Sequence, residues 1–130
     1  MAGVSKGDLE HIGRNVLVVD DEPLIRMSLG AFFEDEGYTV IEADSADTAI
    51  ATLECHAAIH IVITDVQMPG SMDGLKLAHF VRDRWPPTIL IVSSGVARLT
   101  GADLPSRSAF VAKPVDLQHI VQAIEQLSMA

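Results

Sequence analysis

The stretch Val62-Ile63-Thr64-Asp65-Val66-Gln67-Met68-Pro69-Gly70 decides the fold. An apolar run from Ile61 to Ile63 leads into one acidic residue and stops at a Pro-Gly turn. Short β-branched runs bounded by turn residues are typical of buried strands. Asp65 is therefore predicted at the carboxyl end of an interior strand, the edge at which open parallel sheets bind ligands. On this stretch alone, an equal alternative is that Asp65 only initiates the turn.

The rest of the chain alternates strand and helix patterns around this stretch. Short apolar runs predict further strands at 15–19, 38–42, 88–92 and 109–112, with the central strand at 59–64. Apolar residues on a helical period predict helices that begin at Pro23, at a cap on Ser45 or Asp47, at Asp73-Gly74 and after Asp116. Gly101 and Pro105 interrupt the segment 96–108, so any fourth helix there is expected to be short or irregular.

This alternation of five β and five α units predicts an α/β fold. Continuous apolar strands with helical crossovers indicate a parallel sheet that helices cover on both faces. Right-handed crossovers then favour a doubly wound, flavodoxin-like sheet with the strand order 2-1-3-4-5. We expect this single domain over residues 14–130, preceded at 1–13 by a short polar leader that need not be ordered.

Composition excludes several classes of function. The 130 residues carry a formal charge of −9, which disfavours direct binding to nucleic acid or to an anionic membrane. No apolar run approaches the roughly 20 residues that span a bilayer. A single cysteine, Cys55, allows no internal disulfide, so a cytoplasmic location is expected. His56 and His60 are separated by a helix-to-strand junction and predict no metal site.

Functional side chains follow four of the predicted strands. Asp20 and Asp21 end the first strand, Asp65 the third, Ser94 the fourth and Lys113 the fifth. In the order 2-1-3-4-5 these four strands are successive neighbours, so the side chains should converge on one shallow pocket. Clustered carboxylates repel one another, and oxygen ligands favour Mg²⁺ over zinc.

Magnesium beside a lone carboxylate favours phosphoryl transfer. We expect Asp65 to attack phosphorus as a nucleophile, and Lys113 to neutralise charge on the transferring group. The Ser94 hydroxyl would donate a hydrogen bond to the bound phosphoryl group. Simpler interpretations exist for each residue. Asp20-Asp21 could serve only the following helix N-terminus, Ser94 could be a turn residue with Ser93 as the register alternative, and Lys113 could be solvated.

Several motifs together resemble the response-regulator receiver family, the phosphoacceptor half of two-component signalling. The resemblance spans about Val16 to Leu127, nearly the whole chain. Its carriers are Val18-Val19-Asp20-Asp21-Glu22-Pro23, Thr64-Asp65-Val66-Gln67-Met68-Pro69-Gly70, Met72-Asp73-Gly74, Ser94-Gly95 and Lys113-Pro114.

The resemblance implies a phosphoacceptor site. Asp65 would receive phosphate from a histidine kinase or a phosphotransfer protein. Asp20 and Asp21 would hold Mg²⁺ together with the Asp65 carboxylate and the backbone carbonyl of Gln67. Beyond self-phosphorylation and self-dephosphorylation, the family implies no enzymatic turnover.

The resemblance also implies a conformational switch. Ser94 matches the family's switch hydroxyl, and Phe110 matches the aromatic side chain that turns inward on activation, although Phe110 could instead be simple core. The Lys113-Pro114 bond is typically cis in this family. Two departures concern the output face: the gap from Ser94 to Lys113 is a few residues short, and Phe110 has no hydroxyl to offer a partner.

Because the sequence ends soon after the last predicted helix, we expect a stand-alone regulator that switches or relays phosphate by protein–protein contact. Its downstream protein target stays open. One alternative is a receiver fragment of a hybrid histidine kinase or of a larger regulator. Others are a pseudo-receiver that ignores phosphate and an aspartyl-phosphate hydrolase. The hydrolases need Asp-x-Asp after the first strand, whereas the acids here are adjacent, at Asp20 and Asp21.

Overall fold

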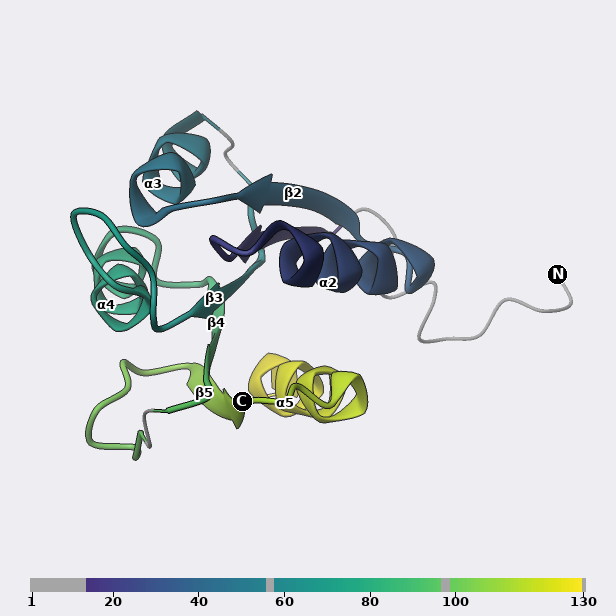
Figure 1. The fold of residues 1–130 in the computed structure, drawn as a ribbon. Helices are drawn as coiled ribbons and strands as arrows, with labels where there is room; N and C mark the ends of the chain where they lie inside the picture. Colours follow the sequence, from purple (N-terminus) through teal and green to yellow (C-terminus); the bar gives the residue numbers. More distant parts are fainter. Residues whose placement is uncertain (1–13, 56–57, 97–98, 130) are drawn as a thin grey trace, which may run out of the picture.

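The computed structural model describes residues 14–55, 58–96 and 99–129, so the predicted leader and His56 lie outside the described residues. Strands and helices alternate along the chain (Figure 1). In order they are β1 (Asn15–Val19), α2 (Pro23–Asp35), β2 (Thr39–Ala43), α3 (Ala46–Cys55), β3 (Ile61–Asp65), α4 (Gly74–Arg84), β4 (Ile89–Ser94), β5 (Ser108–Ala112) and α5 (Leu117–Met129). None of these helices combines the length and apolar character needed to cross a bilayer.

All strand pairs are parallel, and the five strands lie in the order β2-β1-β3-β4-β5, which confirms the predicted topology. The central strands β3 and β4 are buried along their whole length, as expected for continuous apolar runs. Both strands end later than predicted, because Asp65 is the last residue of β3 and Ser93 and Ser94 are the last two residues of β4. Asp65 and Ser94 are therefore strand residues, whereas Asp20, Asp21 and Lys113 follow the ends of β1 and β5.

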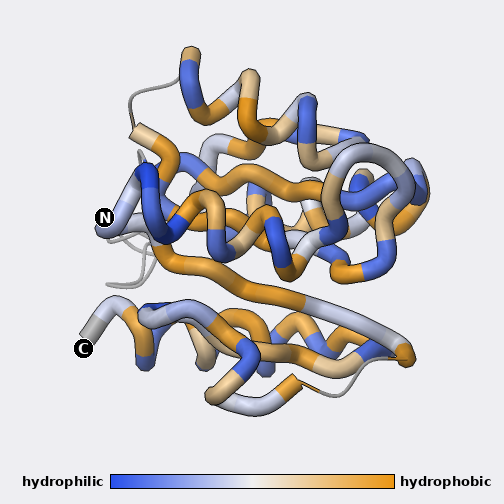
Figure 2. The backbone as a smooth tube through the Cα atoms, turned by 90° about the vertical axis from the view of Figure 1, so that its left-hand side faces the viewer, coloured by the Kyte–Doolittle hydropathy of each residue, from blue (hydrophilic) through white to orange (hydrophobic). Residues whose placement is uncertain are grey.

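Helices cover both faces of the sheet. In Figure 1, α2 and α5 lie on one side of the strands, and α3 and α4 on the other. Alternate residues of β1 feed two separate cores: Val16 and Val18 pack with α2 and α5, whereas Leu17 and Val19 pack with α3 and α4. Figure 2 shows the largely apolar strands running between helices whose turns alternate apolar and polar residues.

Caps and turns set the helix ends. Pro23 begins α2, as predicted. Of the two residues considered as the cap of α3, Ser45 acts: its Oγ accepts the Thr48 N–H at 3.1 Å. Asp73 caps α4 by accepting the Lys76 N–H, and Gly37 ends the α2 turn at φ 99°.

The segment between β4 and β5 forms no helix in its described residues, where turns span 101–103. It is thus more irregular than the short helix considered from the sequence. The Asp103 carboxylate accepts the Thr100 N–H at 2.9 Å, and this local turn competes with helix formation. Side chains of α4 then hold the segment, because His79 contacts the Asp103 carbonyl and Arg82 donates to the Ser106 carbonyl.

Candidate functional site

Three carboxylates meet at the carboxyl edge of the sheet. One oxygen each from Asp20, Asp21 and Asp65 lies within 4.8 Å of the others. Asp20 and Asp65 are buried, and Asp21 is exposed. The predicted convergence of the first and third strands is therefore observed.

Lys113 joins this cluster from the end of β5. Its Nζ lies 3.3 Å from Asp65 Oδ1 and 3.8 Å from Asp20 Oδ2, so the ammonium is paired rather than solvated. The Lys113 N–H donates to the Ser94 carbonyl at 3.0 Å, which continues the β4–β5 pairing beyond the strand. The Lys113-Pro114 bond is cis, as the resemblance implied.

Asp20 is held by contacts that the sequence analysis did not anticipate. Its Oδ1 accepts the Glu22 N–H at 2.9 Å, so Asp20 does contribute to the start of α2 as well as to the cluster. Arg26 donates to the Asp20 carbonyl at 2.8 Å and pairs with Glu42 at 2.9 Å. Glu22 and Arg26 are close to Asp20 along the sequence, so their contacts with Asp20 are local. Glu42 comes from β2 and is brought near only by the fold.

Gly74 allows α4 to approach Asp65. A Cβ at position 74 would lie 1.8 Å from the Asp65 carbonyl oxygen and 2.9 Å from Thr64 Oγ1. The Gly74 N–H donates to the Val66 carbonyl at 2.9 Å. Only glycine therefore permits this packing of the α4 N-terminus against the end of β3.

Ser94 contacts the loop after β3 through a side chain. Its hydroxyl donates to Gln67 Oε1 at 2.7 Å and accepts the Val96 N–H at 3.2 Å. The neighbouring Ser93, the register alternative, has a buried Oγ without a hydrogen-bond partner among the described residues. Ser94 is thus the hydroxyl linked to the segment that follows Asp65. The metal-binding role of the Gln67 backbone carbonyl stays a prediction, and the contact made by the Gln67 side chain could not be predicted from the sequence.

The environment of Asp65 disfavours its charged form. Burial raises the pKa of the Asp65 carboxyl, Lys113 lowers it and Asp20 raises it, with a net increase above the ordinary value. The backbone N–H of Gln67 also lowers this pKa slightly. Asp65 Oδ1 is buried, and among the described residues its close partner is the Lys113 ammonium at 3.3 Å.

These donors fit a hard divalent cation. The cluster offers only carboxylate oxygens, and one of them, the buried Asp65 Oδ1, has only the Lys113 ammonium beside it among the described residues. Magnesium prefers such oxygen ligands and typically takes one or two carboxylates. The net negative charge of three acids against one lysine would be relieved by that cation.

Phe110 lies apart from this cluster. It is half-buried on the edge strand β5, where it pairs with Val92. Its neighbours Ala109 and Val111 pack with α5, so alternation places Phe110 on the opposite face. Phe110 belongs to neither core, and its inward rotation stays a prediction.

Comparison with known proteins finds one family. Residues 16–125 match the model of the response regulator receiver domain. The transcriptional regulatory protein AruR of Pseudomonas aeruginosa is 34 % identical over 119 residues, which are 86 % of this chain and 48 % of AruR. The chain spans about half the length of the curated relatives it matches.

Solved structures agree with this match. A response regulator receiver protein from Sinorhizobium medicae WSM419 is 28 % identical, with a TM-score of 0.82 over 94 % of this chain and 98 % of that chain. The response regulator TrrA from Thermotoga maritima, solved in complex with Mg(2+)-BeF, is 25 % identical, with a TM-score of 0.74 over 88 % of this chain and 98 % of that chain.

Proposed function

Because this chain belongs to the response regulator receiver domain family of two-component systems, we propose that it accepts a phosphoryl group on Asp65 from a histidine kinase or a histidine phosphotransfer protein. One observation carries the proposal: Asp20, Asp21, Asp65 and Lys113, from three strand ends, meet at one edge of the sheet. A structural ion pair would need only one of these acids.

The transfer follows from the positions of these groups. An Asp65 carboxylate oxygen attacks the phosphorus of phosphohistidine, the P–N bond breaks, and the imidazole leaves and takes up a proton from solvent. Lys113 Nζ, already 3.3 Å from Asp65 Oδ1, neutralises charge on the phosphoryl oxygens. Asp20, Asp21 and Asp65, with the Gln67 carbonyl, would hold Mg²⁺, which neutralises the same charge when bound.

The Ser94 hydroxyl would then respond to the phosphoryl group on Asp65. In the structure its proton is donated to Gln67 Oε1. A phosphoryl oxygen on Asp65 is a stronger, charged acceptor, so the Ser94 hydroxyl would exchange Gln67 for phosphate. The loop after β4 would follow Ser94, because the Val96 N–H is bonded to the same hydroxyl.

The kinase is expected to dock beside Lys113. A hollow of about 410 Å³ lies between the start of α2 and the β5–α5 connection, and its lining includes Leu24, Ile25, Lys113 and Pro114. Leu24 at the start of α2 is 79 % exposed. A partner that delivers phosphate to Asp65 must approach Lys113, so this apolar surface would be covered during transfer.

Acetyl phosphate and Mg²⁺ test the central step. Intact mass spectrometry should detect an adduct of about 80 Da, the mass of one phosphoryl group, on Asp65. The adduct should be absent in Asp65→Asn and retained in Asp83→Asn, which removes an exposed carboxylate on α4. An adduct that persists in Asp65→Asn would refute the assignment. Rapid release of many phosphates per protein molecule would instead favour the hydrolase, and no adduct at all would favour the pseudo-receiver.

A further inference from the structure

A second hollow, of about 550 Å³, lies at the amino-terminal edge of the sheet. Its lining includes residues that directly precede four strands: Arg14 before β1, His60 before β3, Thr88 before β4 and Arg107 before β5. All strands are parallel, so this edge is opposite the acidic cluster. The volume is within the range of small-molecule sites.

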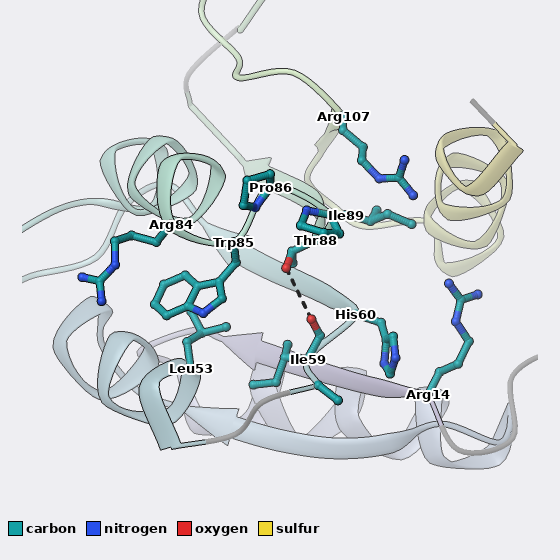
Figure 3. A pocket seen from close by; sticks show the side chains of 12 residues that line it. Arg14, Leu53, Ile59, His60, Arg84, Trp85, Pro86, Thr88, Ile89 and Arg107 are labelled. Atoms are coloured by element: carbon teal, nitrogen blue, oxygen red, sulfur yellow. Dashed lines mark hydrogen bonds between the residues drawn. The ribbon is translucent and has the colours of Figure 1, made fainter.

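Positive charge gathers at this hollow although the chain is acidic. Arg14, Arg84 and Arg107 are three of the nine basic residues in a chain of net charge −9. Arg84 pairs with Glu54 at 3.4 Å. Arg14 and Arg107 form no ion pair with any carboxylate of the described residues, and Figure 3 shows their side chains reaching toward one another on the same side of the hollow.

The Arg107 backbone is held in place, while its side-chain Nε has no acceptor in the part of the chain that the structure describes. Its backbone has φ 55°, and its carbonyl accepts a hydrogen bond from Arg82 at 3.0 Å. Its Nε is buried and has no hydrogen-bond partner among the described residues, a state that is rare for a guanidinium nitrogen. Burial and then the Arg107 charge lower the pKa of Arg82, so an anion beside Arg107 would relieve an existing repulsion.

His60 lies beside Arg14 in Figure 3 and adds a ring N–H donor. Its Nδ1 accepts the Asn15 N–H at 3.0 Å. A nitrogen that accepts cannot carry the proton, so the proton of the neutral ring is on Nε2. That Nε2–H makes no hydrogen bond within the described residues, and it is available to an oxyanion.

The other end of the hollow is formed mainly by apolar side chains, with the Arg84 guanidinium 5.1 Å from the centre of the Trp85 ring. Trp85 lies over Leu53 in Figure 3, and Ile59 and Pro86 complete this end. The Thr88 hydroxyl donates to the Ile59 carbonyl at 3.3 Å and ties the starts of β3 and β4 together. A flat ring packs well on such a surface, beside an indole.

We propose that this hollow binds a nucleotide, with the phosphate between Arg14, Arg107 and His60 and the base against Trp85 and Leu53. Guanidinium groups bind phosphate through paired, charge-assisted hydrogen bonds, which the unpartnered Arg107 Nε would complete. This site is independent of phosphoryl transfer at Asp65, because it uses none of the residues of the acidic cluster.

Trp85 is the only tryptophan of the chain, so its fluorescence reports on the hollow directly. AMP titrated into the full chain in EDTA should change this fluorescence saturably, and the binding should weaken as salt increases. Inorganic phosphate should bind much more weakly, because it lacks the base. Equal affinities for AMP and phosphate would refute the nucleotide assignment.

Charge-removing variants locate the site. Arg14→Gln and Arg107→Gln should each weaken AMP binding roughly tenfold or more, as expected for loss of one charged hydrogen bond. Lys76→Ala, which removes one exposed charge on α4, should bind AMP like the wild type. Amide NMR shifts should change at Asn15 and Thr88. Unaltered affinity in both arginine variants, shifts confined to the Lys113 region, or no saturable binding would each overturn the proposal.

Discussion

Asp65→Asn should stabilise the protein in metal-free buffer at neutral pH. The buried Asp20, within 4.8 Å, repels a charged Asp65 by about 3.5 kcal/mol at an effective dielectric constant of about 20. Asp21 is exposed, so its share approaches the value in water, about 1 kcal/mol. Lys113 at 3.3 Å returns about 5 kcal/mol. These repulsive and attractive energies nearly cancel, so the cost of burying the charge decides whether the variant is more or less stable.

Burial is the largest cause of the raised pKa of Asp65. Ionised Asp65 is therefore less stable in the folded chain than in the unfolded chain, and neutral asparagine avoids that cost. We expect a gain in the free energy of unfolding of about 1–2 kcal/mol, a fraction of the several kcal/mol for a fully buried ion. The melting temperature should rise by about 4–8 °C for a chain of this size.

The gain should depend on pH with a defined sign. A raised pKa means that the folded wild type binds more protons than the unfolded chain between the ordinary carboxyl pKa and the raised value. Wild-type stability therefore falls as pH rises through that window. The advantage of Asp65→Asn should grow over the same window and vanish below it, where Asp65 is neutral in both states.

Urea unfolding followed by circular dichroism in EDTA measures these differences, with Asp83→Asn as the matched loss of an exposed carboxylate. Adding Mg²⁺ should stabilise the wild type more than Asp65→Asn and narrow the gap, because the cation binds the folded site. A variant that is less stable than the wild type in EDTA at neutral pH would refute the reasoning, since the Lys113 pair would then outweigh repulsion and burial together.

Three other substitutions test the packing and the switch. Gly74→Ala should destabilise the chain by about 1–3 kcal/mol in urea unfolding, because its Cβ would lie 1.8 Å from a backbone carbonyl oxygen at the end of β3. Gly101→Ala is the control, because a Cβ at position 101 would have no atom within 4 Å. Similar losses of unfolding free energy in both variants would contradict this account. Lys113→Ala should still be stabilised by Mg²⁺, but phosphorylation should no longer shift the NMR signals of the loop after β4. If those signals shifted as in the wild type, Lys113 would not couple the phosphoryl group to the loop. Leu24→Ser should slow phosphoryl transfer from a kinase at least severalfold and leave labelling by acetyl phosphate unchanged. Val96→Ser, which changes another exposed apolar residue, should affect neither reaction. If the kinase phosphorylated Leu24→Ser as fast as the wild type, docking at α2 would be excluded.

The sheet could be predicted because its local signals agree with one another. Each strand is a short apolar run, and Pro23, Ser45 and Asp73 mark helix starts within a residue or two. The site then follows from topology alone, because parallel strands bring Asp65 and Lys113 to one edge whatever their separation along the chain.

Contacts between side chains of different elements could not be predicted in the same way. The sequence places Gly74 at the start of a helix, but only the packed helix reveals how close it lies to the Asp65 carbonyl. Arg26 and Glu42 are ordinary surface residues until α2 and β2 meet. The Gln67 side chain reaches Ser94 through a rotamer that spacing does not specify.

The Arg82 side chain joins the segment before β5 to the turn before β4. The guanidinium donates to the Ser106 and Arg107 carbonyls before β5 at 2.7 and 3.0 Å, and to the Thr88 carbonyl before β4 at 2.5 Å. It also donates to Pro86, so one cation joins the turn before β4 to the turn before β5. These same two turns form a rim of the arginine-lined hollow. Arg82 therefore ties together the two turns that border the hollow, and sequence spacing does not reveal this role, because Arg82 is there an ordinary basic residue in the last turn of a helix.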